Sequence, residues 1–290
     1  MAEAMIAPLV TNPNIEERPQ ILVNDVSAAA VNKLKGNFPT IQTHSTLTQQ
    51  SVDVDVVVVA VKPQNCSSLF STLQPLLSDS INDPVILSIC AGVPIWQFCQ
   101  GLSTDKVVRT MPNTPATIQQ GVTVWTANGG ASYDGIFTSK EVELCRELLK
   151  SCGMEVQVED EKFIDMATSI SGSGPAYVFL LIESMVDTAV HMGFSREVAT
   201  RLVLQTILGS TLYAEASTTL HPAELRNSVT SPAGTTASAV YELERGGFRS
   251  NVSNAIWACY RRSLEMGGRD SNVGPGRVGE LPSGEFGDMK

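Results

Sequence analysis

Four loops of the chain combine small, hydroxyl-bearing and proline residues in a way that suits ligand binding. They are residues 61–63 (VKP), 111–116 (MPNTPA), 171–177 (SGSGPAY) and 231–236 (SPAGTT). Each follows a predicted strand or precedes a predicted helix, and α/β proteins bind ligands in loops at the carboxyl ends of parallel strands. One loop of this kind is more often a simple turn. Their joint occurrence predicts a binding site.

Short β-branched runs alternate with amphipathic stretches in the first half of the chain. Strands are predicted at residues 21–23, 55–61, 84–90, 106–109, 121–126 and 154–158. This alternation predicts a parallel α/β sheet. The run 55–61 (DVVVVAV) has no polar alternation, so we expect a central strand that is covered on both faces. Thr138 and Glu141 predict a capping box for a helix over 139–152.

Helical periodicity replaces the strand signal from about Asp160. Helices are predicted at residues 161–170, 175–192, 196–216, 235–244 and 250–266. The helix 175–192 is so uniformly apolar that we expect burial nearly all round, which favours oligomerisation through these helices. Domain boundaries are predicted at 1–158 and 159–267. Residues 268–290 are rich in glycine, proline and charge, which predicts a disordered tail.

Composition excludes several classes of protein. With 30 acidic and 20 basic residues the net charge is −10, which repels nucleic acid and anionic lipid, so we expect neither as a partner. No apolar run approaches the roughly 20 residues that span a membrane, and we expect a cytoplasmic protein. The six cysteines lack a C-x-x-C pair and the three histidines lack zinc-ligand spacing. We therefore predict reduced core thiols and no metal site.

The order of the motifs resembles that in pyrroline-5-carboxylate reductase. The resemblance is carried by AVKP (60–63), AGV (91–93), MPNTP (111–115), SGSGPAY (171–177), HP (221–222), SPAGTT (231–236) and GFR (247–249). The stretch 222–244 (PAELRNSVTSPAGTTASAVYELE) is similar to that family's signature throughout, with Ala233-Gly234 in place of the usual glycine pair. The resemblance covers residues 1 to about 266. It implies a Rossmann-like doubly wound parallel sheet followed by an all-helical C-terminal domain.

The opening residues MAEAMI are similar to the helix that follows the first strand and a G-x-G-x-x-[GA] turn in this family. Met1 and Ala2 would be the last two positions of that turn, so the resemblance implies that the first strand and both leading glycines are missing. In such a fold this strand lies mid-sheet and the turn binds the pyrophosphate. We expect a misplaced start or a truncated gene model. The alternative is an ordinary start followed by a helix over residues 1–9.

The resemblance implies reduction of 1-pyrroline-5-carboxylate to L-proline, in proline biosynthesis, by hydride from NADPH or NADH. Residues 1–158 would bind the dinucleotide, and residues 159–267 would bind the substrate and a second subunit, giving a homodimer or a decamer. The loop before the helix 235–244 suits the substrate carboxylate because free N–H groups and the positive dipole end meet there. Thr236 is the candidate catalytic residue, with its hydroxyl near the ring nitrogen. The candidate substrate-binding residues are Ser171, Ser173, Ser231, Ala233, Gly234, Thr235 and Thr236.

Candidate cofactor-binding residues lie in the first domain. They are Met1, Ala2, Asn24, Asp25, Ala60, Val61, Lys62, Pro63, Ala91, Gly92 and Asn113. Lys62 and Asn113 follow predicted strands, so they should face the ribose and nicotinamide end of the cofactor. Asn24 and Asp25 end a strand where an acidic residue accepts the ribose hydroxyls of NAD and repels the 2′-phosphate of NADP. No arginine stands beside them, which favours NADH, although the family often uses NADPH.

Two other hypotheses stay open at this point. The chain is either a catalytically silent subunit that co-assembles with intact copies, or another imine or β-hydroxyacid dehydrogenase with a similar two-domain plan. The second hypothesis stays open because a fold by itself does not determine the substrate.

Overall fold

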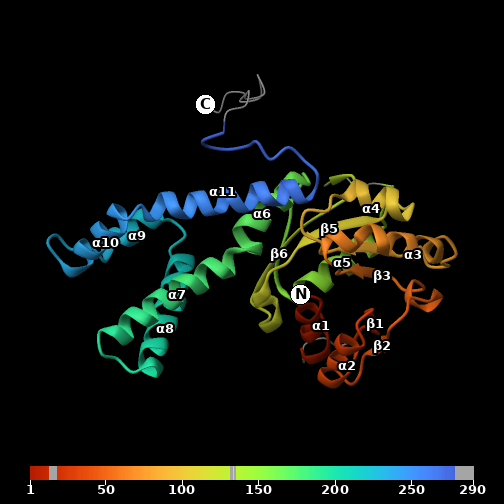
Figure 1. The fold of residues 1–290 in the computed structure, drawn as a ribbon, viewed down its shortest axis with the longest axis horizontal. Helices are drawn as coiled ribbons and strands as arrows, with labels where there is room; N and C mark the ends of the chain where they lie inside the picture. The colour runs from red at the N-terminus through yellow and green to blue at the C-terminus, as the bar shows by residue number, and fades with distance from the viewer. Residues whose placement is uncertain (13–17, 131–132, 134, 278–290) are drawn as a thin grey trace. The chain divides into compact units, whose positions relative to one another are not determined.

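The β-branched runs of the first half of the chain form the main sheet (Figure 1). The computed structural model describes residues 1–12, 18–130, 133 and 135–277. Within them, five strands pair in the order β3 (Val56–Val59), β4 (Val85–Ser88), β5 (Val107–Met111), β6 (Gly121–Ala127) and β7 (Gly153–Gln157). All pairs are parallel except β5 with β6. The α/β class with a mostly parallel sheet is confirmed.

The antiparallel β5–β6 pair corrects the prediction of a purely parallel sheet. A parallel neighbour needs a crossover connection of a dozen or more residues. The segment between these strands instead forms a short 3-10 helix, Thr114–Ile118, which returns the chain at the same end of the sheet. The connection is therefore too short for a crossover.

A separate sheet pairs β1 (Leu22–Asn24) with β2 (Gln42–His44) in parallel. No strand among the described residues joins it to the main sheet. The strand β3 was predicted to be central, but it lies at an edge of the main sheet. Val58 of this strand is 38% exposed. The polar strand β2 was not predicted, because its residues QTH carry no apolar signal.

Helices cover both faces of the main sheet. Val85 and Leu87 of β4 pack with Met5 of α1 (Ala2–Thr11) and with α5 (Ser139–Lys150), while Ile86 faces the cluster of α3 (Cys66–Ser78) and α4 (Ile95–Leu102). The next residue of α1, Ile6, packs against α2 (Ala28–Asn37) beside β1. One helix therefore holds the two sheets together by burial. The predicted capping box of Thr138 and Glu141 begins α5 and is confirmed.

The described elements after β7 are helical. They are α6 (Lys162–Ala167), a π-helix over Thr168–Gly172, α7 (Gly174–His191), α8 (Arg196–Ala216), α9 (Pro222–Ser228), α10 (Thr235–Arg245) and α11 (Phe248–Met266). The chain divides into two compact units, Met1–Ser173 with the chain from Trp257 on, and Gly174–Ile256. The predicted boundary at residue 158 falls inside the first unit, where Arg109 of β5 bonds to Asp165 of α6, and Ser263 near the end of α11 bonds to the same Asp165. The domain assignment itself stays a prediction.

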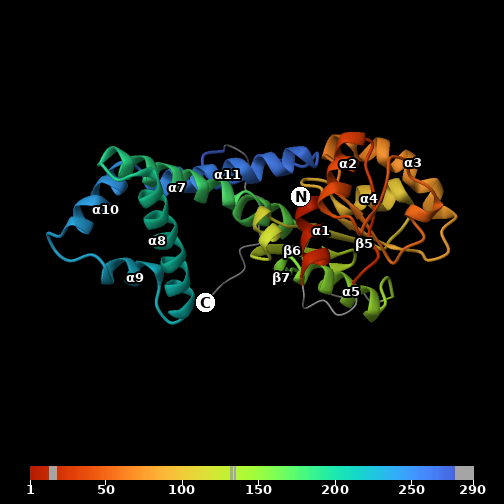
Figure 2. The ribbon, with the colours of Figure 1, turned by 90° about the horizontal axis from the view of Figure 1, so that it is seen from below.

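Figure 2 labels the helices α7, α8, α9 and α10 of the second unit. Many of the large apolar residues on these helices are exposed. Val186 of α7 packs with Ala199 and Val203 of α8 in a small core. Phe179 and Leu180 of α7 are 60% and 63% exposed. The elements of a single chain therefore do not cover this helix, and its burial between subunits stays a prediction. In the described parts of the chain, no helix is long and apolar enough to cross a membrane.

The start of the predicted disordered tail is held by side chains of α11. Arg261 donates from Nε to the Val273 carbonyl at 2.8 Å and from Nη2 to the Pro275 carbonyl at 3.0 Å. These two hydrogen bonds join the backbone at Val273 and Pro275 to α11, and the disorder of residues 268–290 stays a prediction. Residues 278–290 lie outside the described part of the chain.

Candidate functional site

Asn113 joins two of the loops that the sequence singled out. It follows β5 and begins the 3-10 helix Thr114–Ile118. Its Nδ2 donates to the Ser171 carbonyl at 3.1 Å, and its Oδ1 accepts from the Val122 amide at 3.0 Å. The side chain is 7% exposed. Each end of its amide makes a hydrogen bond within the protein, so Asn113 holds the loop in shape, and its contact with a cofactor stays a prediction.

Ser171 and Ser173 lie at the end of the π-helix that leads into α7. Ser171 donates its hydroxyl to the Ala167 carbonyl at 3.1 Å, and the Ser173 hydroxyl lies 3.1 Å from the thiol of Cys259 on α11. π-Helical turns are frequent at functional sites, since one extra residue per turn re-aims the following side chains. The turn therefore presents Ser173 next to α11, a contact that the sequence did not predict.

The Ala91–Gly92 loop is shaped by α11. Gly92 has φ +76°, and a Cβ on it would come within 2.8 Å of Cβ of Met266 and 3.1 Å of the Ser263 carbonyl. Only glycine fits this position. The close packing of α11 against Gly92 therefore explains the glycine at this position independently of the predicted contact with a cofactor.

The residues after β1 and β3 are more open. Lys62 is exposed and forms no ion pair with any described residue, and Ala60, Val61 and Pro63 flank it. Asn24 accepts from the Ser51 hydroxyl at 3.3 Å, and Asp25 accepts from the backbone amide of Ser27 at 2.8 Å. The described contacts do not tie these residues to Asn113 and Ser171.

The N-terminus of α1 carries Met1 and Ala2. Met1 occupies the N-cap and makes no side-chain capping bond, so the first N–H groups of this helix lack a side-chain acceptor. The nearby carboxylate of Glu3 is turned to Lys33 and Asn37, at 2.8 Å each, which lowers the pKa of Glu3. An uncapped helix N-terminus is suited to an anionic group.

The candidate substrate loop forms the N-terminus of α10 in the second unit. Gly234 is the N-cap, and no side chain caps the helix. A Cβ at Gly234 would collide with the hydroxyl of Ser231, which faces it across the turn. Thr236 is half-buried, and its hydroxyl makes no hydrogen bond to a described residue. Thr235 stands beside it in the first turn of the helix.

Ala233 departs from the usual preference for its backbone conformation. Its φ is +58°, in the left-handed region, where a side chain costs roughly 1–2 kcal/mol relative to glycine. This is the position at which the sequence replaces the first glycine of the family's pair. Ala233 therefore adopts a left-handed backbone conformation that glycine adopts more readily.

Sequence reasoning missed a buried ion-pair network behind these loops. Arg109 of β5 is 1% exposed, and Asp165 of α6 is fully buried. The guanidinium donates to both carboxylate oxygens of Asp165, at 2.9 and 3.1 Å. Asp165 also accepts from the Ser263 hydroxyl at 2.7 Å and from Arg269. The available signal was an arginine inside the apolar run VVRTM, since a charge in a buried strand needs a partner.

The pKa of Asp165 shows how complete this pairing is. Burial raises the pKa of the carboxyl, but the positive charge of Arg109 and the hydrogen bonds from Arg109, Arg269 and Ser263 outweigh it. The resulting pKa lies below the ordinary value for aspartate. Asp165 is therefore a structural anion and not a proton donor at neutral pH.

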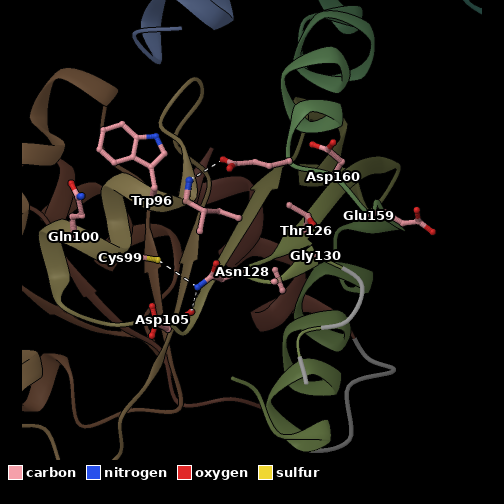
Figure 3. Close-up of a pocket in the computed structure, with 13 residues that line it drawn as sticks. Trp96, Cys99, Gln100, Asp105, Thr126, Asn128, Gly130, Glu159 and Asp160 are labelled. Carbon is pink, nitrogen blue, oxygen red and sulfur yellow. Dashed lines mark hydrogen bonds between the residues drawn. The ribbon is translucent and has the colours of Figure 1, made fainter. Parts of the chain in front are cut away.

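An open pocket of about 640 Å³ lies elsewhere on the first unit (Figure 3). It is lined by α4 and by the ends of β6 and β7, with Trp96, Asp105, Glu159 and Asp160 around it. Asn128 bridges Cys99 and the Asp105 carbonyl across one wall. None of the candidate site residues lines this pocket. We therefore place the candidate site in the loops and not in this pocket.

Known proteins match the chain over most of its length. The family model for pyrroline-5-carboxylate reductase dimerisation matches residues 161–266. A pyrroline-5-carboxylate reductase of Pseudomonas aeruginosa is 39% identical over 248 residues, covering 85% of this chain and 87% of the relative. One from Synechocystis is 36% identical over 92% of this chain and 95% of the relative. The crystal structure of Plasmodium falciparum pyrroline carboxylate reductase with NADP bound is 31% identical and superposes with a TM-score of 0.79, covering 91% of this chain and 94% of that one.

Proposed function

The chain belongs to the pyrroline-5-carboxylate reductase family, and on that basis we propose that it reduces 1-pyrroline-5-carboxylate to L-proline. Hydride adds to the carbon of the cyclic C=N bond, and a proton adds to its nitrogen. NADPH or NADH, when bound, supplies the hydride. The single observation that supports the substrate assignment is the uncapped N-terminus of α10, with the free Thr236 hydroxyl in its first turn.

The loop before α10 suits the substrate carboxylate. The first amides of the helix and its positive dipole end stabilise an anion, and Ser231 adds a hydroxyl on the other side of the turn. Thr236 would then direct its hydroxyl at the ring nitrogen. A threonine hydroxyl is a weak acid, so orientation of the imine is its main role in this proposal. Ser171 and Ser173 are proposed to line the substrate side.

The residues of the first unit fit a nicotinamide dinucleotide in part. The uncapped start of α1 suits a diphosphate, the exposed ammonium of Lys62 is free to bind a ribose or phosphate oxygen, and Asp25 stands where a ribose hydroxyl can donate. Asp25 favours NADH over NADPH in this proposal, while Ala60, Val61, Pro63, Ala91 and Gly92 would contact the cofactor through the backbone. Asn113 would act through the loop that it holds.

Substitution of Thr236 tests the site. Thr236→Val keeps the shape and removes the hydroxyl, whereas Thr236→Ser keeps the hydroxyl. Loss of one hydrogen bond predicts up to about tenfold lower kcat/KM for Thr236→Val and near-normal turnover for Thr236→Ser. If both variants turn over like the parent, Thr236 has no role in orientation.

The split between β1 and β3 favours a second candidate function, a silent subunit that co-assembles with intact copies. The test compares oxidation of NADH and NADPH with 1-pyrroline-5-carboxylate by the chain as given and by a chain that carries an added strand and a G-x-G-x-x-A turn. Activity in the given chain supports the reductase, whereas activity only in the extended chain shows that the given chain is silent by itself. A hydroxyacid in place of the imine tests for a different dehydrogenase and should give no turnover.

We also propose that the chain forms a homodimer through its helical unit, that such dimers assemble into larger rings up to a decamer, and that the protein works in the cytoplasm. Leu204, Leu208 and Leu212 repeat every four residues on α8 and are 48%, 53% and 53% exposed, which makes one apolar stripe. Leu208→Glu should give a monomer in sedimentation, and Gln205→Glu, which adds the same charge on the same helix, should leave the oligomer intact. Equal sedimentation of both variants would refute this interface.

A further inference from the structure

The network around Arg109 reaches more than one candidate loop. Arg109 donates from Nη1 to Oε1 of Glu161 at 2.7 Å, and the same oxygen accepts the backbone amide of Ile95 at 2.8 Å. Ile95 is the first residue of α4, immediately after the Ala91–Val93 loop. Glu161 therefore ties the start of α4 to strand β5 through one carboxylate.

Asp165 ties the same arginine to two further segments. It lies on α6, six residues before Ser171 in a nearly continuous helical stretch. Ser263 on α11 donates to it, and the backbone around Ser263 and Met266 closes over Gly92. The carboxylate is fully buried and accepts from four donors. A charge held in this way has no freedom to change its geometry.

Arg109 and Asn113 lie on the same strand and its immediate extension. Asn113 bonds to the Ser171 carbonyl, so β5 is fastened to the α6 and π-helix segment at two points, by Arg109 to Asp165 and by Asn113 to Ser171. Two hydrogen-bonded contacts restrict both the separation and the rotation of the helical segment relative to β5, whereas a single contact leaves the segment free to rotate. The three loops at Gly92, Asn113 and Ser171 thus share one buried anchor.

We propose that Glu161, Arg109 and Asp165 are positioning residues that hold the Gly92, Asn113 and Ser171–Ser173 loops in one fixed arrangement. We rely on the proposed function when we infer that this arrangement serves reduction of the imine. The positioning acts through the loops and needs no contact between the network and a ligand. It differs from a purely stabilising ion pair because its loss loosens these loops more than it loosens the rest of the unit.

Hydrogen exchange of the full chain, followed by mass spectrometry, tests this. Arg109→Lys keeps the buried positive charge but loses the planar fork that reaches Asp165 and Glu161 together. We expect amides in residues 90–96 and 168–173 to exchange about tenfold faster than in the parent, since charge-assisted hydrogen bonds are lost at both places. The matched control is Arg146→Lys, in the pair of Arg146 with Glu155 at 3.2 Å, which should leave both segments unchanged.

Two substitutions at Glu161 test the contact with α4 separately from the contact between Arg109 and Asp165. Glu161 is 27% exposed, so its replacement should fold. Glu161→Ala should speed exchange in residues 90–96, and Glu161→Gln, whose amide oxygen still accepts from Ile95, should restore it. The proposal is overturned if Arg109→Lys leaves 168–173 at the parent rate, or if it speeds exchange equally throughout the unit.

Turnover of 1-pyrroline-5-carboxylate is measured on the same samples. Misplaced loops predict a kcat for Arg109→Lys at least about tenfold below that of Arg146→Lys. A parent chain without turnover would contradict the proposed function, while the exchange pattern would still decide whether the network positions the loops.

Discussion

Breaking the buried pair of Arg109 and Asp165 should cost a large part of the stability of the chain. In Arg109→Met the aliphatic stem remains, but fully buried Asp165 loses two of its four donors and keeps only Ser263 and Arg269. Removing one partner of a buried pair leaves an uncompensated charge and typically costs about 3–5 kcal/mol. A whole domain has only about 5–15 kcal/mol, so we expect a substantial fraction of the unfolding free energy to disappear.

Urea unfolding followed by far-UV circular dichroism measures this loss. With a slope of about 1–3 kcal/mol per molar urea, the midpoint should fall by at least about 1 M. Arg146→Met is the control, because its pair with Glu155 is partly exposed and pairs of that kind contribute about 0–1 kcal/mol. If Arg109→Met shifts the midpoint no more than Arg146→Met, the reasoning about buried charge is refuted.

A double variant separates charge from packing. In Arg109→Met with Asp165→Leu, both charges are gone, and apolar groups fill the space. Replacing both partners of a buried pair is often neutral, so the double variant should be more stable than Arg109→Met. Arg269 is 30% exposed and can turn to water. A double variant as unstable as the sum of the single changes would show that packing, not charge, sets the cost.

Three further outcomes follow from particular contacts. The pKa of Asp165 is lowered in the folded chain, so its ionised carboxylate stabilises the fold above the unfolded pKa of about 3.9, and this stabilisation is lost as the pH falls below that value. The urea midpoint, measured at pH 5, 4 and 3, should therefore fall more steeply for the parent than for Asp165→Asn. Parallel curves for the two proteins would contradict this. Thr138→Ala removes the acceptor for the Glu141 amide at 3.2 Å and should cost about 1 kcal/mol, whereas Thr138→Ser should cost little, both measured by urea unfolding. Ala233→Gly relieves the left-handed strain but frees the unfolded chain, so the net change in unfolding free energy should stay within about 1 kcal/mol; a loss of several kcal/mol would show that the alanine methyl packs.

Local signals in the sequence determined much of this protein. The capping box at Thr138, the strands from Val56 to Gln157 and the long helices after Asp160 follow from side-chain spacing, which acts within a few residues. The sequence also indicated the loop before α10, because small and hydroxyl residues precede a helical period there, while the role of Thr236 came from the family resemblance and stays a prediction. The motif order pointed to the family to which the chain belongs.

Only the tertiary structure decided how distant segments meet. A valine run looks the same at the edge of a sheet as in its centre, so the place of β3 depended on which strands pair beside it. Arg109 and Asp165 lie 56 positions apart, and Asp165 and Ser263 lie 98 apart, which no periodicity connects. The left-handed backbone of Ala233 likewise depends on the turn around it. Spacing governs neighbours along the chain, whereas pairing across it is determined by the free energy of the whole packed core.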